Sequence, residues 1–198
     1  MPGRRLIGDP PGKRKALKAA KVLFARRGYQ NTTTKEIAAL AGISPATIFK
    51  YYESKEALLR AIVDDLAETS KTDFFLRVQA VDSLEELTHL VVADRLAFFE
   101  HHQLEIMIIV QEYLVGNPGL FNLDELVVFA NYSFNQAVNR IRRHPTRLNP
   151  TCSAVDVMRT IVGFISTYLL QQVYLPGAPR PTPAVLEEQI LRSLTVDS

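Results

Sequence analysis

The chain has 198 residues, of which 47% are hydrophobic and 22% are charged, and its formal net charge is +2. These values are typical of a globular protein that buries a core without disulfides or a structural metal. The single cysteine, Cys152, excludes an intrachain disulfide and fits a reducing compartment. No apolar segment follows the basic N-terminus, and the apolar part of the longest uncharged stretch is too short to span a bilayer. We therefore expect a cytoplasmic protein with neither a secretory signal nor a membrane span.

The charge is divided unevenly along the chain. Residues 1–60 hold 13 lysines and arginines against 4 acidic residues, a net charge of +9, whereas residues 61–198 hold 10 against 17, a net charge of −7. Such asymmetry suggests a polyanion-binding end joined to a body with another task. A solvated basic face without a partner is the alternative that charge alone leaves open.

The N-terminal third divides into an arm and a first helix. Residues 1–12 contain three prolines and three glycines, which predict a flexible basic arm. From Lys13 onward the apolar residues follow a helical spacing, and the stripe ends before Gly28, a residue type that often closes helices.

Two short helices follow. Thr33 and Glu36 have the spacing of a capping box, which predicts a helix over Thr34–Ala41. A Ser-Pro dipeptide then predicts an N-cap and the first turn of a helix over Pro45–Tyr52. The connecting turn, Gly42-Ile43-Ser44, gives the pair the spacing of a helix-turn-helix, whose second helix enters the major groove of DNA.

The rest of the chain is helical in period and shows no alternating strand pattern. The expected helices run from Ser54 to about Val81 and over Ser83–His101, Leu104–Val115, Leu123–Arg143, Cys152–Leu175 and Pro183–Leu194. The sequence therefore predicts an all-α fold of about nine helices.

Three sequence stretches carry a resemblance to a known family. They are LKAAKVLFARRG at residues 17–28, TTKEIAALAGIS at residues 33–44 and ATIFKYYESKEAL at residues 46–58. Together they resemble the DNA-binding region of TetR-type (tetracycline-repressor-like) transcriptional regulators. The resemblance implies a three-helix DNA-binding domain over 13–60 and a larger helical domain for effector binding and dimerisation over 61–198. That larger part resembles the family only in length, helix count and apolar character.

The resemblance also implies DNA contacts at eight positions: Thr34, Lys35, Pro45, Ala46, Thr47, Lys50, Tyr51 and Lys55. Thr34 and Lys35, at the start of the first short helix, would bind phosphate, and Lys35 could instead reach a base edge. The first three residues of the second helix would face the groove floor, where alanine can contact a thymine methyl and threonine can bond a base or phosphate. Lys50 would read a base, with guanine favoured, unless it is only a solvated lysine. Tyr51 and Lys55 would clamp phosphates.

Two aromatic positions depart from the family pattern. The family usually has tyrosine where this chain has Phe49 and phenylalanine where it has Tyr52. Phe49 lacks a hydroxyl for a phosphate, and Tyr52 is expected in the core. Sequence preference is therefore expected to differ from that of relatives.

The body is expected to dimerise, because a two-fold operator needs a two-fold protein. The resemblance implies a homodimer through residues 152–175 and 183–194, which would form a four-helix bundle with their symmetry mates. The first of these helices is apolar on more than one side, as a helix with both a core and a partner would be. The alternative is a central helix of a monomer.

An effector cavity is also implied, for a small molecule of largely apolar or aromatic character. The candidate lining residues are Phe98, Met107, Tyr113, Phe129, Tyr132, Phe164 and Tyr168. An aromatic stripe at helical spacing is more often core than cavity, so only part of this set is expected to line one. Glu105, Glu112 and Arg159 are polar exceptions on apolar helices, and Arg159 could pair with an effector carboxylate or with Asp156.

Catalytic and cofactor sites are not expected. The sequence has no nucleophile elbow, no phosphate-binding glycine loop and no triad-like arrangement. His101, His102 and Glu105 offer at most two ligands to a metal, so we expect no metal site and no cofactor. A redox role for Cys152 is conceivable but lacks a resolving cysteine.

These observations predict a DNA-binding transcriptional regulator, a dimeric repressor that a small-molecule effector releases from an inverted-repeat operator. Two alternatives belong to other classes. An architectural helical protein would coat DNA without reading it, so that random DNA would compete as well as a selected site. A small helical enzyme would need an acid–base pair or a nucleophile that the sequence does not offer.

Overall fold

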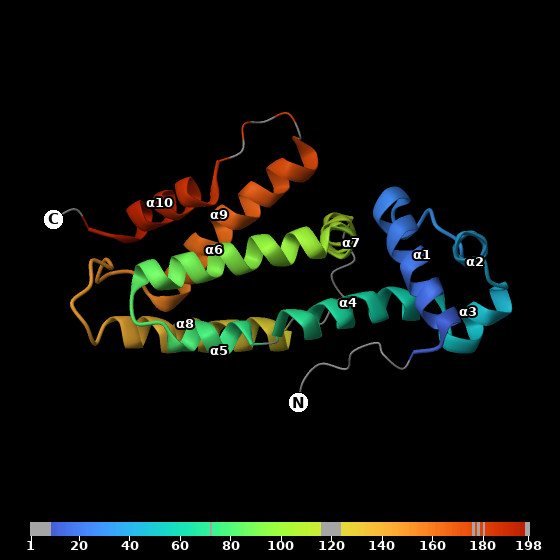
Figure 1. The fold of residues 1–198 in the computed structure, drawn as a ribbon, viewed down its shortest axis with the longest axis horizontal. Coiled ribbons are helices and arrows are strands. Elements are labelled where there is room, and N and C mark those ends of the chain that lie inside the picture. The colour runs from blue at the N-terminus through green and yellow to red at the C-terminus, as the bar shows by residue number, and fades with distance from the viewer. Residues whose placement is uncertain are drawn as a thin grey trace. The chain divides into compact units, whose positions relative to one another are not determined.

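The computed structural model describes residues 9–71, 73–115, 124–175, 177, 179 and 181–196. Within these residues the secondary structure is helical, apart from an isolated bridge between Leu148 and Thr195 (Figure 1). The helices are α1 (Pro11–Arg27), α2 (Thr34–Ala41), α3 (Pro45–Tyr51), α4 (Lys55–Lys71), α5 (Phe74–Ala80), α6 (Leu84–His101), α7 (Gln103–Leu114), α8 (Asp124–Ile141), α9 (Ala154–Tyr174) and α10 (Pro183–Leu194). The all-α prediction is confirmed. None of these helices is both long and apolar enough to cross a membrane.

Two of the expected boundaries differ from the sequence prediction. The helix expected from Ser54 to about Val81 is instead two helices, and α5 begins after Asp73. Polar residues such as Thr69, Ser70 and Asp73, which favour caps over helix interiors, explain the break. The first helix begins at Pro11, inside the segment expected as an arm, because proline suits a first helical turn. Residues 1–8, including the arginines expected in the arm, lie outside the described residues.

The chain forms two compact units. The first comprises residues 1–72 and 102–123, and therefore holds α1 to α4 together with α7. The second comprises residues 73–101 and 124–198, with α5, α6, α8, α9 and α10. The division does not follow the chain order, because α7 belongs with the four N-terminal helices. The functional boundary at residue 60 stays a prediction.

In the first unit, α1 contacts α2, α3, α4 and α7. Its alanines and large apolar side chains face inward, and Phe24 is fully buried with Tyr29 edge-on at 5.3 Å between ring centroids. Ile108 of α7 is buried in the same cluster, and Met107 packs against it. This apolar contact explains why α7 groups with the helices at the N-terminus.

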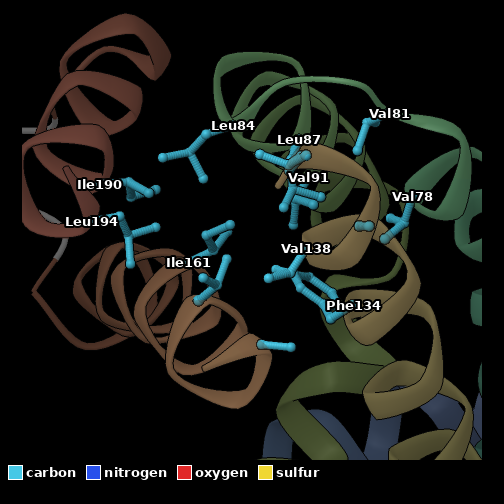
Figure 2. Packing of buried hydrophobic residues seen from close by; sticks show 14 of the residues in the cluster. Val78, Val81, Leu84, Leu87, Val91, Phe134, Val138, Ile161, Ile190 and Leu194 are labelled. Carbon is cyan, nitrogen blue, oxygen red and sulfur yellow. The ribbon is translucent and has the colours of Figure 1, made fainter. Parts of the chain in front are cut away.

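The second unit has its own core, shown in Figure 2. Side chains from all five of its helices meet there, and α5 runs along α8 while α10 packs on both α6 and α9. Leu87, Ile161 and Ile190 are fully buried and come from three different helices. The bridge between Leu148 and Thr195 ties the segment before α9 to the end of α10.

Candidate nucleic-acid interface

The start of α2 is fixed by the expected capping box. Thr33 Oγ1 accepts a hydrogen bond from the Glu36 backbone N–H at 3.2 Å, and Glu36 Oε2 accepts one from the Thr33 N–H at 2.8 Å. The Thr33 N–H and the Thr33 hydroxyl both donate to the Glu36 carboxylate, and these two bonds lower the pKa of Glu36 below its usual value. Thr34, half-buried, and Lys35, exposed, therefore stand in the first turn of a well-defined helix.

The turn between α2 and α3 needs the glycine that the sequence supplies. Gly42 has φ 63° and ψ 40°, the left-handed conformation, and its N–H bonds back to the last turn of α2. Ser44 then caps α3 by accepting a hydrogen bond from the Thr47 N–H at 3.2 Å. The helix-turn-helix geometry thus follows from two caps and one glycine.

Helix α3 is anchored by its apolar side and leaves its other side in solvent. Ile48 is fully buried, in one cluster with Ile37 and Ala38 of α2. The predicted contacts Pro45, Ala46 and Lys50 are exposed, and Phe49 is 52% exposed. Tyr52 is buried as expected, and burial raises its pKa to about 12.

Two further predicted contacts lie against the start of α1. A Cβ atom added at Gly12 would lie 3.1 Å from Thr47 Cγ2 and 3.2 Å from the ring of Tyr51. The absence of a side chain at Gly12 therefore lets α1 approach α3 closely. Both Thr47 and Tyr51 are half-buried, with Lys50 Nζ 5.6 Å from the Tyr51 ring centroid.

Lys55 differs from the other predicted contacts because its charge is turned inward. Its Nζ donates hydrogen bonds to the backbone carbonyls of Tyr29 at 2.9 Å and Thr32 at 3.0 Å. The ammonium group of Lys55, which the resemblance assigns to a phosphate, is therefore bound to backbone carbonyls of its own chain. The remaining seven predicted contacts lie on α2 and α3, and their DNA roles stay predictions.

Helix α7 is joined to the N-terminal helices by polar contacts as well as by Ile108. Lys21 Nζ of α1 lies 2.7 Å from Glu105 Oε1 and 3.4 Å from Asp65 Oδ2 of α4. Burial raises the pKa of Glu105, but the hydrogen bond and charge of Lys21 outweigh this effect and the net pKa is lowered. Further along α7, the Gln111 Nε2 donates to the carbonyl of Ala25 at 3.2 Å.

A third polar contact lies at the end of α7. Glu112 is 2% exposed, and its Oε1 lies 3.4 Å from the Tyr29 N–H. The sequence marked Glu105 and Glu112 as unusual on an apolar helix but did not identify Lys21 or Tyr29 as their partners. The sequence indicated only that a carboxylate buried on an apolar helix needs a hydrogen-bond donor, and it did not indicate which residue supplies the donor.

The seven predicted effector residues are divided between the units. In the first unit, Met107 packs against the core and Tyr113 is exposed. In the second, Phe98 lies beside Arg95, Phe129 packs edge-on against Phe75, and Tyr132 is exposed. Phe164 and Tyr168 of this set lie together in a groove between α9 and α10. Effector binding by these residues stays a prediction.

The groove between α9 and α10 has further features. Besides Phe164 and Tyr168 it is lined by Arg159 and Gly163 of α9 and by Leu186 of α10. The hydrogen bonds of Ser153 lower the pKa of Asp156, and the nearby charge of Arg159 adds to this effect. The pairing of Arg159 with Asp156 that the sequence suggested stays a prediction.

The other polar candidates do not form a metal site in the described part of the chain. His102 Nδ1 lies 3.8 Å from Glu105 Oε1, whereas His101 Nδ1 is 2.7 Å from the carbonyl of Ala97. No group of three or more metal-ligating side chains occurs among the described residues. Cys152 is a partly buried thiol just before α9.

Comparison with known proteins gives one family match. The family described as "Bacterial regulatory proteins, tetR family" matches residues 16–62, which cover α1 to α3 and the first half of α4. The HTH-type transcriptional regulator YvkB of Bacillus subtilis is 32% identical over 99 residues, 46% of this chain and 52% of YvkB. The chain spans about half the length of the curated relatives it matches.

Solved structures extend the likeness to the whole fold. The ketosteroid transcriptional regulator KstR2 of Mycobacterium tuberculosis superposes with a TM-score of 0.69 at 19% identity, covering 93% of this chain and 95% of KstR2. AibR, in complex with isovaleryl coenzyme A and operator DNA, gives a TM-score of 0.65 at 20% identity and covers 93% and 98%. At these identities the likeness establishes the fold alone.

Proposed function

We propose that the chain is a sequence-specific DNA-binding transcriptional regulator, because residues 16–62 match the family described as "Bacterial regulatory proteins, tetR family". The observation that carries the proposal is the helix-turn-helix of α2 and α3, whose caps fix the turn while the start of α3 stays exposed. Its location in the segment with a net charge of +9 supports binding to a polyanion.

Within this function the predicted contact residues of α2 and α3 divide into two roles. Thr34, Lys35 and Tyr51 would bind phosphates and set the orientation on the duplex. Pro45 and Ala46 would face the floor of the major groove beside Thr47, and Lys50 would read a base. Thr47 is partly occupied by its contact with Ser44, 2.9 Å between hydroxyl oxygens.

We further propose that the protein acts as a homodimer through α9 and α10. Val162 and Leu170 of α9 are each 45% exposed, and Val185 of α10 is 41% exposed, so both helices carry apolar surface outward. A Cβ atom at Gly163 would meet nothing within 4 Å, so the chain's own packing does not require a glycine in mid-helix. Close approach of a partner helix would explain why this position holds a residue without a side chain.

We propose that a largely apolar small molecule releases this dimer from its operator, as a repressor's effector would. Related folds support the class of ligand: AibR is solved with isovaleryl coenzyme A, and FadR of Bacillus subtilis with stearoyl-CoA. The effector must bind the released conformation more tightly than the DNA-bound one, since otherwise it would shift nothing.

The first experiment is selection of bound fragments from a random duplex library at about 100 mM salt, where nonspecific phosphate binding is weakened. We expect recovery of an inverted repeat whose half-sites lie about one helical turn, ~34 Å, apart. Recovery of no motif by folded, dimeric protein would contradict sequence reading and would favour the architectural alternative. Mass spectrometry of a denatured extract would then show whether a bound inducer had masked the activity.

A further inference from the structure

We infer that Lys55 is a positioning residue: it supports DNA binding by holding the loop that leads into α2, not by binding phosphate. The inference rests on the proposed function and deepens it, because it assigns a role inside the domain to a lysine that the resemblance places on DNA. It also predicts a property of the protein without DNA, so it can be tested separately from operator binding.

The contacts of Lys55 surround its charge on several sides. The side chain starts in the first turn of α4 and reaches the loop between α1 and α2, where Nζ donates to the carbonyls of Tyr29 at 2.9 Å and Thr32 at 3.0 Å. The same ammonium lies 4.1 Å from the centroid of the Tyr29 ring. A compact ammonium fits two carbonyls beneath one ring, whereas a planar guanidinium is wider and requires a different donor geometry.

The loop that receives Lys55 is ordered from within as well. Thr32 is 1% exposed, and its Oγ1 donates a hydrogen bond to the carbonyl of Gly28 at 3.0 Å. The Thr32 N–H donates to the Tyr29 carbonyl at 3.2 Å. The two carbonyls that bind Lys55 therefore belong to a single tight turn with a fixed direction.

This turn leads directly into the DNA-facing helix. Thr32 is followed by Thr33, the N-cap of α2, and then by the predicted phosphate contacts Thr34 and Lys35. The Thr32 carbonyl belongs to the same peptide group as the Thr33 N–H, which donates to Glu36 in the capping box. Lys55 therefore ties the start of α4 to the start of α2, across a sequence separation of 23 residues.

The test compares Lys55→Arg and Lys55→Met with wild type in the full chain. Arginine would keep a phosphate contact, so a DNA-binding role predicts that Lys55→Arg retains affinity. A positioning role predicts that both variants weaken binding to the selected duplex by about tenfold, the effect of one charged hydrogen bond. Both should also speed amide hydrogen exchange at Thr32, Thr33 and Glu36 in the protein without DNA.

Two controls accompany these variants. Lys35→Met removes an exposed lysine, and we expect it to weaken DNA binding with exchange at the three amides unchanged. Tyr29→Leu removes the ring above the ammonium but keeps both carbonyls, and we expect it to speed exchange as Lys55→Met does. It also keeps the inference testable if a Lys55 variant fails to fold.

Wild-type affinity in Lys55→Arg, or unchanged exchange in both Lys55 variants, would overturn the inference. Faster exchange together with weaker binding in both would support it. If the wild-type chain selects no DNA motif, the proposed function fails, and exchange unchanged in the Lys55 variants would then overturn the positioning role as well.

Discussion

Lys50 is the residue to which the proposed function assigns a contact with a base. It is exposed on α3, and its Nζ lies 5.6 Å from the centroid of the Tyr51 ring. We expect Lys50→Ala to lose about 1–3 kcal/mol of discrimination at one base pair while folding normally. Competition assays with single-base variants of the selected duplex would measure this. Unchanged preference at every position would show that Lys50 does not read a base.

Lys35 provides the comparison for that experiment. It is exposed at the start of α2 and is assigned to phosphate. Lys35→Ala should weaken binding to all sequences alike and reduce the slope of log K against log salt by about 0.9. The two lysines therefore separate base contact from phosphate contact on neighbouring helices.

The stability that the capping box contributes depends on pH, because one of its members is the carboxylate of Glu36. Its pKa is lowered by the hydrogen bonds from Thr33, so it contributes stability above its unfolded-state pKa, and this is lost as pH falls through the lower folded-state pKa. Glu36→Gln can still accept from the Thr33 N–H but does not titrate. We therefore expect its melting temperature to fall less than that of wild type as the pH is lowered below the ordinary glutamate pKa. Glu53→Gln, at an exposed carboxylate, should behave like wild type; equal acid sensitivity in both variants would contradict the assignment.

At the scale of elements, the attachment of α7 to α1 depends on the Lys21–Glu105 pair. Lys21→Met would leave Glu105 nearly buried without its main cation, and we expect a loss of about 1–3 kcal/mol in the free energy of unfolding at neutral pH. The partial exposure of both side chains keeps this below the effect of a fully buried pair. Thermal or denaturant unfolding would measure it, with Lys18→Met, at an exposed lysine of the same helix, as the control.

The pH dependence of this difference gives a second check. The Lys21 interaction lowers the pKa of Glu105, so its contribution is present above the unfolded-state pKa and is lost as pH falls. In Lys21→Met a backbone hydrogen bond and the charge of His102 are left to oppose burial, and the pKa of Glu105 should rise. The stability difference between variant and wild type should therefore shrink on acidification. A constant difference would mean that the lost contacts of the lysine stem, not its charge, destabilise the variant.

Elements defined by local chemistry were predictable from sequence, whereas their grouping was not. The caps at Thr33 and Ser44 and the left-handed Gly42 depend on neighbours within a few residues, and each was expected. The partners of Glu105 and Glu112 are 84 and 83 residues away, and no periodicity encodes such distances. The inward direction of Lys55 was missed for the same reason, since its acceptors are backbone carbonyls that any sequence would supply.

At the scale of the whole molecule, Gly163 distinguishes a dimer from a monomer. The glycine is exposed in mid-helix and faces open space within its own chain, so a larger side chain there should not disturb the fold. Because lysine has a higher helix propensity than glycine, Gly163→Lys should leave the monomer as stable or raise its stability by about 0.5–1 kcal/mol. In a two-fold dimer the same change would place two like charges and two long side chains at a close helix contact. We therefore expect a monomer by sedimentation, with affinity for the inverted repeat reduced towards that for a half-site.

A charge-matched control makes the result specific to this face. Ala93 is exposed on α6, outside the two helices proposed to form the dimer, so Ala93→Lys should remain dimeric and bind the full repeat. A dimeric Gly163→Lys protein with wild-type affinity would place the two-fold contact elsewhere on the chain. Loss of the dimer with unchanged affinity for a half-site would instead show that each helix-turn-helix reads DNA by itself and that α9 and α10 supply only the spacing. Spacing is then the quantity an effector would have to change to release the operator, because binding energy from two half-sites is realised only when both can be reached together.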